Sequence, residues 1–251
     1  MYFLIIYILI IGLALGSFFN VVGLRVPQNQ SIVAPRSACP NCHHKLNPYE
    51  LIPVLSYIIQ GGKCRQCKVR ISPIYPLMEL LTGLLFAAAP LILGWSSELF
   101  VAWTLISLFM IIFVSDIKYM IIPDKVLLVF TGIFLLERIL IPLEPWWNSL
   151  LGAAVGFSLL LFIAIISKGG MGGGDIKLFA LIGLVVGLKV VLLSFFLATL
   201  YGAVFGIIGL LTGKLKRKNP IPFGPFIVAG TLTAYFYGDL ILESYFRLFA
   251  S

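Results

Sequence analysis

Long runs of apolar residues limit what this chain can fold into more than any other feature. The first 24 residues contain no charged side chain, and further apolar stretches follow at about 74–94, 99–115, 126–143, 146–167, 176–188, 190–212 and 221–238. A helix needs about 20 mostly apolar residues to cross a bilayer. We therefore expect an all-α polytopic membrane protein with about eight transmembrane helices. The stretch 126–143 is the weakest, because Glu137 and Arg138 lie inside it.

The composition excludes the common soluble classes. Hydrophobic residues make up 60% of the chain and charged residues only 11%, whereas a soluble domain carries about 25% charged residues. A disordered chain, a fibrous repeat and an ordinary soluble enzyme are thereby excluded. The formal net charge of +8 is typical of a membrane protein with basic cytoplasmic loops that contact anionic lipid, so no nucleic-acid partner is expected.

The distribution of basic residues predicts the orientation. The loops 25–73, 116–125, 168–177 and 213–220 hold 7, 2, 2 and 4 Lys or Arg, which is 15 of the 18 in the chain. Basic loops stay in the cytoplasm, so both termini should face outward. The last of these loops contains the basic run 214–218, which we expect to anchor the seventh predicted span, 190–212, at the lipid surface. We divide the chain into a first transmembrane helix (1–24), a cytoplasmic cysteine loop (25–73) and a membrane core of about seven helices (74–251).

All four cysteines lie in the predicted cytoplasmic loop, as two Cys-x2-Cys pairs separated by 21 residues. Two such pairs can place four thiolates around one tetrahedral zinc ion. Disulfides are the alternative, but a reducing cytoplasm disfavours them. His43 and His44 directly follow the first pair, and either could compete as a ligand, but a complete set of cysteines favours a bystander role for both. The predicted zinc ligands are Cys39, Cys42, Cys64 and Cys67. Four thiolates leave no open coordination position, so this zinc should be structural and should supply folding free energy to a loop with little apolar material.

Two aspartates fall at predicted cytoplasmic helix ends. Asp116 closes the third apolar stretch, and Asp175 begins the sixth, after a run of glycines. Two carboxylates brought together can share one proton, because both cannot easily ionise at short range. One then acts as a general base on water while the other donates to a substrate carbonyl, which is the chemistry of an aspartic protease. The simpler interpretation is a flexible loop in which Asp175 caps a helix. Asp124 is likewise explained as a cap or loop residue.

Other residues near these aspartates are candidates for supporting roles. Glycine permits close backbone approach and positive φ, and a bare backbone edge can pair with an extended peptide. We therefore expect Gly172, Gly173, Gly174 and Lys177 to support a substrate loop. Glu79 lies in the second apolar stretch, and an intramembrane acid is a functional candidate. It could instead lie near the interface and pair with a loop cation such as Arg70.

The combination of motifs resembles the bacterial type IV prepilin leader peptidases, which are membrane aspartic proteases that also N-methylate the mature pilin. The resemblance covers nearly the whole chain. The matching segments are Gly16-Ser17-Phe18-Phe19-Asn20-Val21-Val22 with Arg25-Val26-Pro27, the two cysteine pairs, Ile52-Pro53-Val54-Leu55-Ser56-Tyr57, Ile71-Ser72-Pro73-Ile74-Tyr75-Pro76-Leu77-Met78-Glu79, Asp116 with Pro123-Asp124, and Gly170-Met171-Gly172-Gly173-Gly174-Asp175-Ile176-Lys177. The glycine–aspartate pattern is shared with presenilin-like proteases, but the cysteine loop is not. Some members carry a second acid where this chain has Lys118.

The resemblance implies Asp116 and Asp175 as the catalytic pair, with the active site at the cytoplasmic face of the cell membrane. It implies as substrate a prepilin or pseudopilin precursor with a short basic leader, cleaved just before a hydrophobic helix. The new N-terminal amine would then be methylated from S-adenosyl-L-methionine. No glycine-rich nucleotide motif locates a site for that methyl donor. The short chain and modest loops resemble the competence-pilus type.

Two other functional classes are compatible with parts of the sequence. A polytopic transporter with a zinc-stabilised cytoplasmic loop would also contain glycine-broken helices, but its acids should lie near the bilayer midplane. A zinc-dependent assembly scaffold would tolerate the loss of either aspartate. The position of both aspartates at helix ends on one side favours the peptidase.

Overall fold

The computed structural model describes residues 2–168, 170–213 and 221–249. Of these, residues 248 and 249 are described by their backbone only. All regular structure in these ranges is helical, apart from two isolated β-bridges in the cysteine loop. The elements are α1 (Tyr2–Arg25), the 3-10 helices η1 (Val26–Gln28) and η2 (Pro48–Leu51), α2 (Leu55–Ile59), α3 (Ile74–Leu93), α4 (Glu98–Tyr119), α5 (Asp124–Leu140), α6 (Asn148–Ile166), α7 (Gly173–Leu211) and α8 (Gly224–Phe249). The predicted all-α class is confirmed. The basic run 214–218 lies outside the described residues.

Six helices in the described ranges are long and apolar enough to cross a membrane, namely α1, α3, α4, α6, α7 and α8. These helices make the chain a multi-pass membrane protein, as predicted. Two helices explain the difference from the expected eight segments. At 17 residues α5 is shorter than the others, and at 39 residues α7 has about twice the length of one crossing.

Helix α7 folds back on itself at Gly187. The ring centroids of Phe179 and Phe195 lie 6.1 Å apart, although a straight helix would separate these positions by about 24 Å. Gly187 has φ +76° and ψ 179°, which breaks the helical path, and only glycine adopts this conformation without strain. The two arms correspond to the predicted segments 176–188 and 190–212, so the eight apolar segments of the sequence are all present as helices.

Two polar side chains from neighbouring helices bind the backbone at this turn. Arg138 Nε of α5 donates to the carbonyl of Val185 at 2.7 Å, and a cation there suits the carboxyl end of a helix. Asn148 Oδ1 of α6 accepts from the N–H of Leu188 at 3.0 Å, as an N-cap does. Arg138, which made the predicted segment 126–143 look weak, is thus a buried capping residue.

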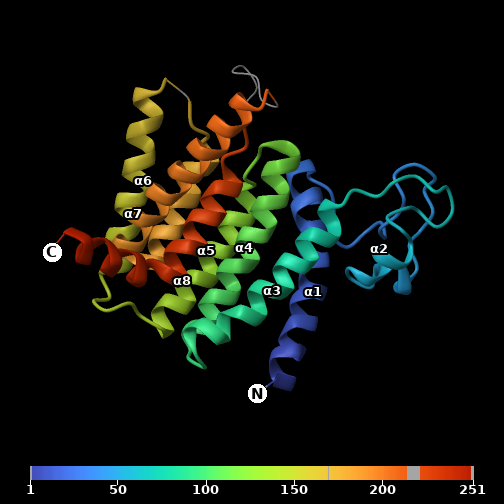
Figure 1. Cartoon of the computed structure of the whole chain (residues 1–251), viewed down its shortest axis with the longest axis horizontal. Coiled ribbons are helices and arrows are strands. Elements are labelled where there is room, and N and C mark those ends of the chain that lie inside the picture. The colour runs from blue at the N-terminus through green and yellow to red at the C-terminus, as the bar shows by residue number, and fades with distance from the viewer. Residues whose placement is uncertain (1, 169, 214–220, 250–251) are drawn as a thin grey trace. The chain divides into compact units, whose positions relative to one another are not determined.

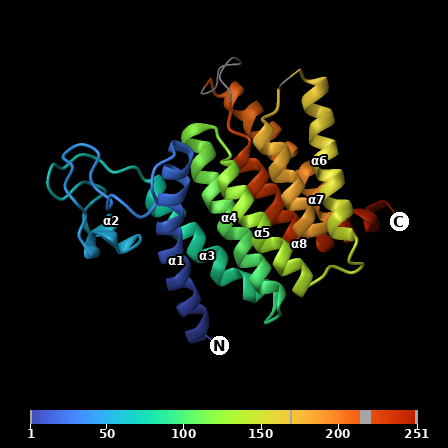
Figure 2. The ribbon, with the colours of Figure 1, turned by 180° about the vertical axis from the view of Figure 1, so that it is seen from behind.

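The chain divides into two compact units, residues 1–118 and 119–251. In the first unit α1 and α3 lie side by side, as both views show (Figures 1 and 2). Gly16 makes this approach possible, because a Cβ there would lie 2.8 Å from the Cα of Glu79. Gly23 allows the end of α1 to approach α4 in the same way, against Ile111 and Val114. The cysteine loop extends from the ends of α1 and α3 (Figure 1).

In the second unit small residues again mediate helix packing. Gly152 and Gly156 of α6 contact the two arms of α7, and Gly230 of α8 lies against Ala198. Small residues at helix interfaces are typical of membrane proteins, since lipid gives no hydrophobic force between helices. The sequence-based division at residues 24 and 73 follows membrane boundaries rather than contacts, and it stays a prediction.

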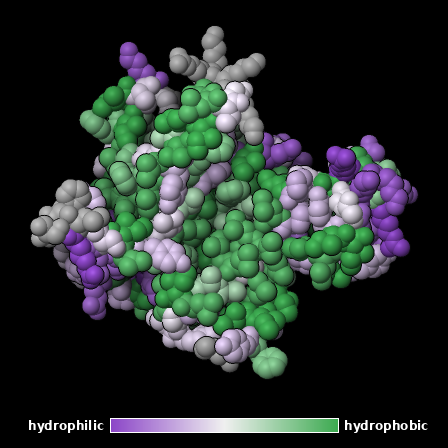
Figure 3. Space-filling view, in the orientation of Figure 1, coloured by the Kyte–Doolittle hydropathy of each residue, from purple (hydrophilic) through white to green (hydrophobic). Residues whose placement is uncertain are grey.

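Large apolar side chains face outward along the helices. Leu128, Ile139, Phe162 and Phe196 each expose 60% or more of their surface. Figure 3 shows hydrophobic residues over most of the visible helical surface, while hydrophilic residues gather on the outer end of the cysteine loop. Apolar surface on this scale requires lipid rather than water as its solvent.

Candidate functional site

The four cysteines converge in the loop of the first unit. Their Sγ atoms all lie within 4.8 Å of one another, with Cys39–Cys67 at 3.7 Å and Cys42–Cys64 at 3.8 Å. Zn–S bonds of about 2.3 Å in tetrahedral geometry give S–S distances of about 3.8 Å. The cluster therefore has the dimensions of a tetrahedral four-thiolate metal site, built from the predicted residues.

The two cysteine pairs form the same local structure. The N–H of His43 donates to the carbonyl of Cys39 at 3.0 Å, and the N–H of Lys68 donates to that of Cys64 at 3.0 Å. His43 and Lys68, each four residues after the first cysteine of its pair, have φ values of 56° and 59°. The first cysteine of each pair also donates its own N–H, Cys39 to the carbonyl of His44 and Cys64 to the carbonyl of Val69. This repeated tight turn directs the sulfurs of each pair toward the other pair.

Backbone donors around the cluster favour thiolates. The N–H of Val69 donates to Cys67 and lowers the pKa of that thiol to about 6. Donors at Cys42 and Asn41 lower the pKa of Cys39 from its ordinary value. Thiolate is the metal-binding form of cysteine. Burial and the neighbouring Cys67, Cys39 and Cys64 instead raise the pKa of Cys42 to about 12, so this thiol has to lose its proton when a cation binds.

His44 is engaged away from the sulfurs. Its Nε2 lies 3.1 Å from Oε2 of Glu50. The N–H of Asn47 donates to the same oxygen at 2.9 Å, and this bond, together with His44, lowers the pKa of the Glu50 carboxyl. The contact agrees with the prediction that the histidine is a bystander rather than a ligand.

Asp116 lies in the last turn of α4 in the first unit. The sequence placed it just beyond a helix ending near 115, whereas α4 continues to Tyr119. The residue is buried, on the turn that follows the contact of Ile111 and Val114 with Gly23. Its carboxyl thus belongs to a helical carboxyl end, where the dipole disfavours an anion.

Asp175 lies in the first turn of α7 in the second unit. Its Oδ2 accepts a hydrogen bond of 3.2 Å from the N–H of Gly172, the residue that precedes the helix. The sequence analysis considered Asp175 as the cap itself, whereas Gly172 is the cap residue and Asp175 bonds back to it from the third helical position. A carboxylate at a helix N-terminus is stabilised as an anion. The side chain is half-buried.

The glycines before Asp175 differ from one another. Gly172 has extended backbone, with φ −72° and ψ 143°, whereas Gly173 and Gly174 are already helical. None of these three glycines has positive φ. The ability of glycine to adopt positive φ, expected from the sequence, is therefore not used in this conformation. A Cβ on Gly174 would lie 2.8 Å from Cβ of Ile122, whereas one on Gly173 would meet open space. Gly174 therefore allows the loop before α5 to approach α7.

Lys177 contacts this same loop. Its Nζ lies 2.8 Å from Oδ2 of Asp124, the first residue of α5. Both side chains are more than half exposed, so the ion pair adds little stability. The structure thus brings Asp175, Gly174, Lys177 and Asp124 to one end of the second unit, while Asp116 belongs to the first.

Glu79 is buried near the start of α3, with 9% of its surface exposed. Its Oε2 accepts a hydrogen bond of 2.8 Å from the N–H of Val54 in the cysteine loop. Val54 has φ +60°, which is strained for a β-branched residue. This hydrogen bond therefore connects α3 to the cysteine loop.

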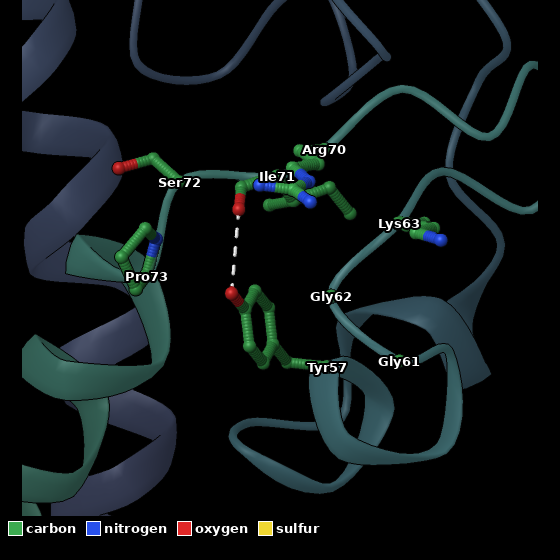
Figure 4. A pocket seen from close by; sticks show the side chains of 8 residues that line it. All are labelled: Tyr57, Gly61, Gly62, Lys63, Arg70, Ile71, Ser72 and Pro73. Carbon is green, nitrogen blue, oxygen red and sulfur yellow. Dashed lines mark hydrogen bonds between the residues drawn. The ribbon is translucent and has the colours of Figure 1, made fainter.

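Two cavities that the sequence analysis did not predict lie around this connection. The first has a volume of about 480 Å³ and is lined by the end of α1, the cysteine loop and the start of α3. The second has a volume of about 600 Å³ and lies between Tyr57, Gly62 and Arg70 (Figure 4). In Figure 4 the Tyr57 hydroxyl points toward the carbonyl of Ile71, to which it donates at 3.3 Å. Asn20, a polar residue in the apolar first stretch, was the signal that could have revealed the first cavity.

Family models match both halves of the chain. Residues 10–93 match the bacterial peptidase A24 N-terminal domain, and residues 103–207 match the type IV leader peptidase family. The prepilin leader peptidase/N-methyltransferase of Bacillus subtilis (strain 168) is 49% identical over 239 residues, which cover 95% of this chain and 96% of that protein. The protein of the same name from Pseudomonas aeruginosa is 32% identical and covers 95% of this chain and 92% of its own length. No solved structure gives a significant match.

These findings define the chain as a multi-pass membrane protein of the leader-peptidase class. More particularly, it belongs to the prepilin leader peptidase/N-methyltransferase family. The resemblance stated from the sequence motifs is confirmed, and the transporter alternative is not favoured.

Proposed function

We propose that the chain cleaves the short leader from type IV prepilin-like precursors and then N-methylates the new N-terminal residue. The observation that carries this proposal is the identity of 49% with a prepilin leader peptidase/N-methyltransferase over nearly the full length of both chains. The predicted aspartate motifs and the cysteine cluster lie within the matched segments. Assignment to a competence pilus stays a prediction from chain length and loop size.

The proposed catalytic pair is Asp116 and Asp175. Only six positions separate Asp116 from Ile122, and Ile122 packs on Gly174, the neighbour of Asp175. Asp175, at a helix N-terminus, suits the anionic general base that activates water. Asp116, near a helical carboxyl end, suits the protonated partner that donates to the scissile carbonyl. In such a pair the apparent pKa values belong to both carboxyls together.

Supporting residues keep the second carboxylate in place. Gly172 donates its N–H to Asp175, Gly174 admits Ile122, and Lys177 pairs with Asp124 across the same loop. Gly173 completes the predicted support segment and leaves open space beside the helix start. A peptide substrate has to approach this end of the second unit.

The metal of the cysteine cluster is zinc in this proposal, with a structural role. Four thiolates at tetrahedral spacing are the donors of a closed zinc site, and no coordination position remains for catalysis. When bound, zinc supplies folding free energy to the loop. The loop lies on the cytoplasmic side of the cell membrane, by the excess of basic residues.

The reaction is tested by co-expressing the chain with a prepilin-like substrate in cells that lack their own leader peptidase. Mass spectrometry of the substrate should show loss of the leader and one added methyl group on the new N-terminus. Cells with the substrate alone should retain the leader. An intact leader in the presence of folded, membrane-inserted protein would contradict the proposed function.

A further inference from the structure

The cavity of about 480 Å³ in the first unit has a polar wall that the cleavage reaction does not use. Ligand pockets in proteins commonly hold about 300–1,000 Å³. Three residues of this wall carry hydrogen-bond acceptors and are at least nine-tenths buried, namely Asn20, Glu50 and Glu79. A wall so rich in acceptors needs a ligand that supplies N–H or O–H donors, or a positive charge.

Two of these acceptors have no donor among the residues that the structure describes. Asn20 Nδ2 donates to the carbonyl of Tyr75 at 3.1 Å, while its Oδ1 is buried and unpaired. Glu50 Oε2 takes the bonds from His44 and Asn47, while its Oε1 is buried and unpaired. A buried acceptor without a partner is unfavourable, and native structures rarely leave one unpaired. Both residues line the cavity, so a molecule bound there can supply the missing donors.

The remainder of the wall combines opposite charge with apolar surface. Arg25 and Arg70 contribute guanidinium groups, and Val21, Leu24 and Tyr57 contribute apolar and aromatic surface. The complementary ligand carries a cation or amine for the carboxylates, a carboxylate for the arginines and a flat group for the apolar side. A zwitterionic amino-acid derivative with an aromatic ring has this chemistry.

We propose that this cavity is the binding site for S-adenosyl-L-methionine, with the Glu79 carboxylate and the Asn20 amide as polar contacts. This rests on the proposed function, which includes methylation. When bound, the donor supplies a methyl group carried on a cationic sulfur. The methyl carbon forms a bond to the nitrogen of the substrate amine, and its bond to sulfur breaks with the electron pair remaining on sulfur. The amine loses a proton. The cationic sulfur is the group that a buried carboxylate recognises.

The surrounding structure is built to hold such a site. Cys39 and Cys64 line the cavity, so the metal module forms one of its walls. Glu79 binds the N–H of strained Val54, and strain held by surrounding structure is typical of ligand sites. The cavity of Figure 4 shares Tyr57, Arg70 and Ser72 with this one, which gives a second molecule space next to the donor.

Direct binding tests the proposal without relying on activity. Radiolabelled S-adenosyl-L-methionine is equilibrated by dialysis against the purified full chain in detergent. Glu79→Gln keeps an acceptor for Val54 but removes the charge, and we expect it to weaken binding about tenfold or more. Asn20→Leu, on a different helix, should weaken it also. The control Glu144→Gln, at an exposed loop position, should bind like the wild type and should still cleave the leader.

Photocrosslinking gives a second readout that does not depend on variants. Ultraviolet irradiation of the complex should attach the label to peptides from 17–25, 37–64 or 69–79. Label confined to other segments, or wild-type affinity in both Glu79→Gln and Asn20→Leu, would overturn the site. Absence of any binding by wild-type protein that still cleaves its substrate would also overturn it, while the proposed peptidase would stand. Failure of cleavage in the wild type would instead reject the proposed function.

Discussion

Asp116 and Asp175 are chemically identical residues in opposite helical environments. One lies in the last turn of α4, and the other lies in the first turn of α7, where it accepts from Gly172. The helix dipole disfavours the anion at the first position and stabilises it at the second. A difference of this kind is how two carboxyls divide the acid and base roles of one reaction.

Adding one methyl group to either of two neighbouring glycines before Asp175 should have different effects. Gly174→Ala places a Cβ 2.8 Å from Ile122, whereas Gly173→Ala meets open space. We expect Gly174→Ala to lower the free energy of unfolding by about 1–3 kcal/mol, as overpacking does, and to slow leader cleavage. Gly173→Ala should match the wild type in its free energy of unfolding, because its Cβ meets no neighbouring atom. Thermal melting in detergent and a cleavage time course measure the two effects, and equal behaviour of the two variants would refute this distinction.

Sequence reasoning found the residues with distinctive chemistry and missed those defined by contacts. The cysteines and the two motif aspartates stand out because their types and spacing are rare in apolar sequence. Arg138 looked like a defect in a helix, and only its bond to Val185 reveals a capping role. Asn20 was visible as part of a motif, but its unpaired oxygen in a cavity depends on how α1 packs against the loop.

At the scale of elements, the apolar pattern predicted nearly all helices within a few residues. The boundary near Lys189 fell beside Gly187, where α7 folds back. The pattern could not predict that α4 continues through Asp116 or that α8 extends to residue 249. Both extensions carry polar residues, whose helical state is decided by packing and by the membrane edge rather than by hydropathy.

The two cysteine turns make a prediction about the metal. Cys64→Ser removes one of four thiolates from a buried position, so the zinc proposed for this cluster, about one per wild-type chain by the four-ligand rule, should be lost. Cleavage should persist, because no cysteine acts on the peptide bond. His43→Asn is the matched control, since asparagine tolerates the positive φ of this turn. Elemental analysis of the purified proteins gives the result. Zinc retained by Cys64→Ser, or lost from His43→Asn, would be incompatible with the assigned ligands.

At the scale of the whole molecule, the basic loops predict the orientation. With 15 of 18 basic residues in one set of loops, we propose that the cysteine loop and both aspartates lie on the cytoplasmic side. A peptidase for leaders that remain in the cytoplasm requires this arrangement, because the leader precedes the hydrophobic helix of its substrate.

Cysteine labelling in intact cells tests the orientation. Val33→Cys lies in the cysteine loop at a position with 84% of its surface exposed, and Ser97→Cys lies in the exposed loop before α4. A membrane-impermeant maleimide should label Ser97→Cys in intact cells and Val33→Cys only after permeabilisation. The parent chain, whose cysteines all lie in the loop, provides the background. External labelling of Val33→Cys would reverse the topology.

The central claim is that two particular carboxylates cleave the leader. The most direct measurement is cleavage of a co-expressed prepilin by Asp116→Asn, Asp175→Asn and the control Asp124→Asn, with membrane insertion and zinc content checked for each. Because each carboxyl of the proposed pair would perform a different half of the proton transfer, either of the first two variants should leave the substrate uncut while folding normally. Asp124→Asn, which loses only an exposed ion pair with Lys177, should retain most activity. Full cleavage by Asp116→Asn or Asp175→Asn would contradict the account, and loss of cleavage in Asp124→Asn alone would move the catalytic role to that residue.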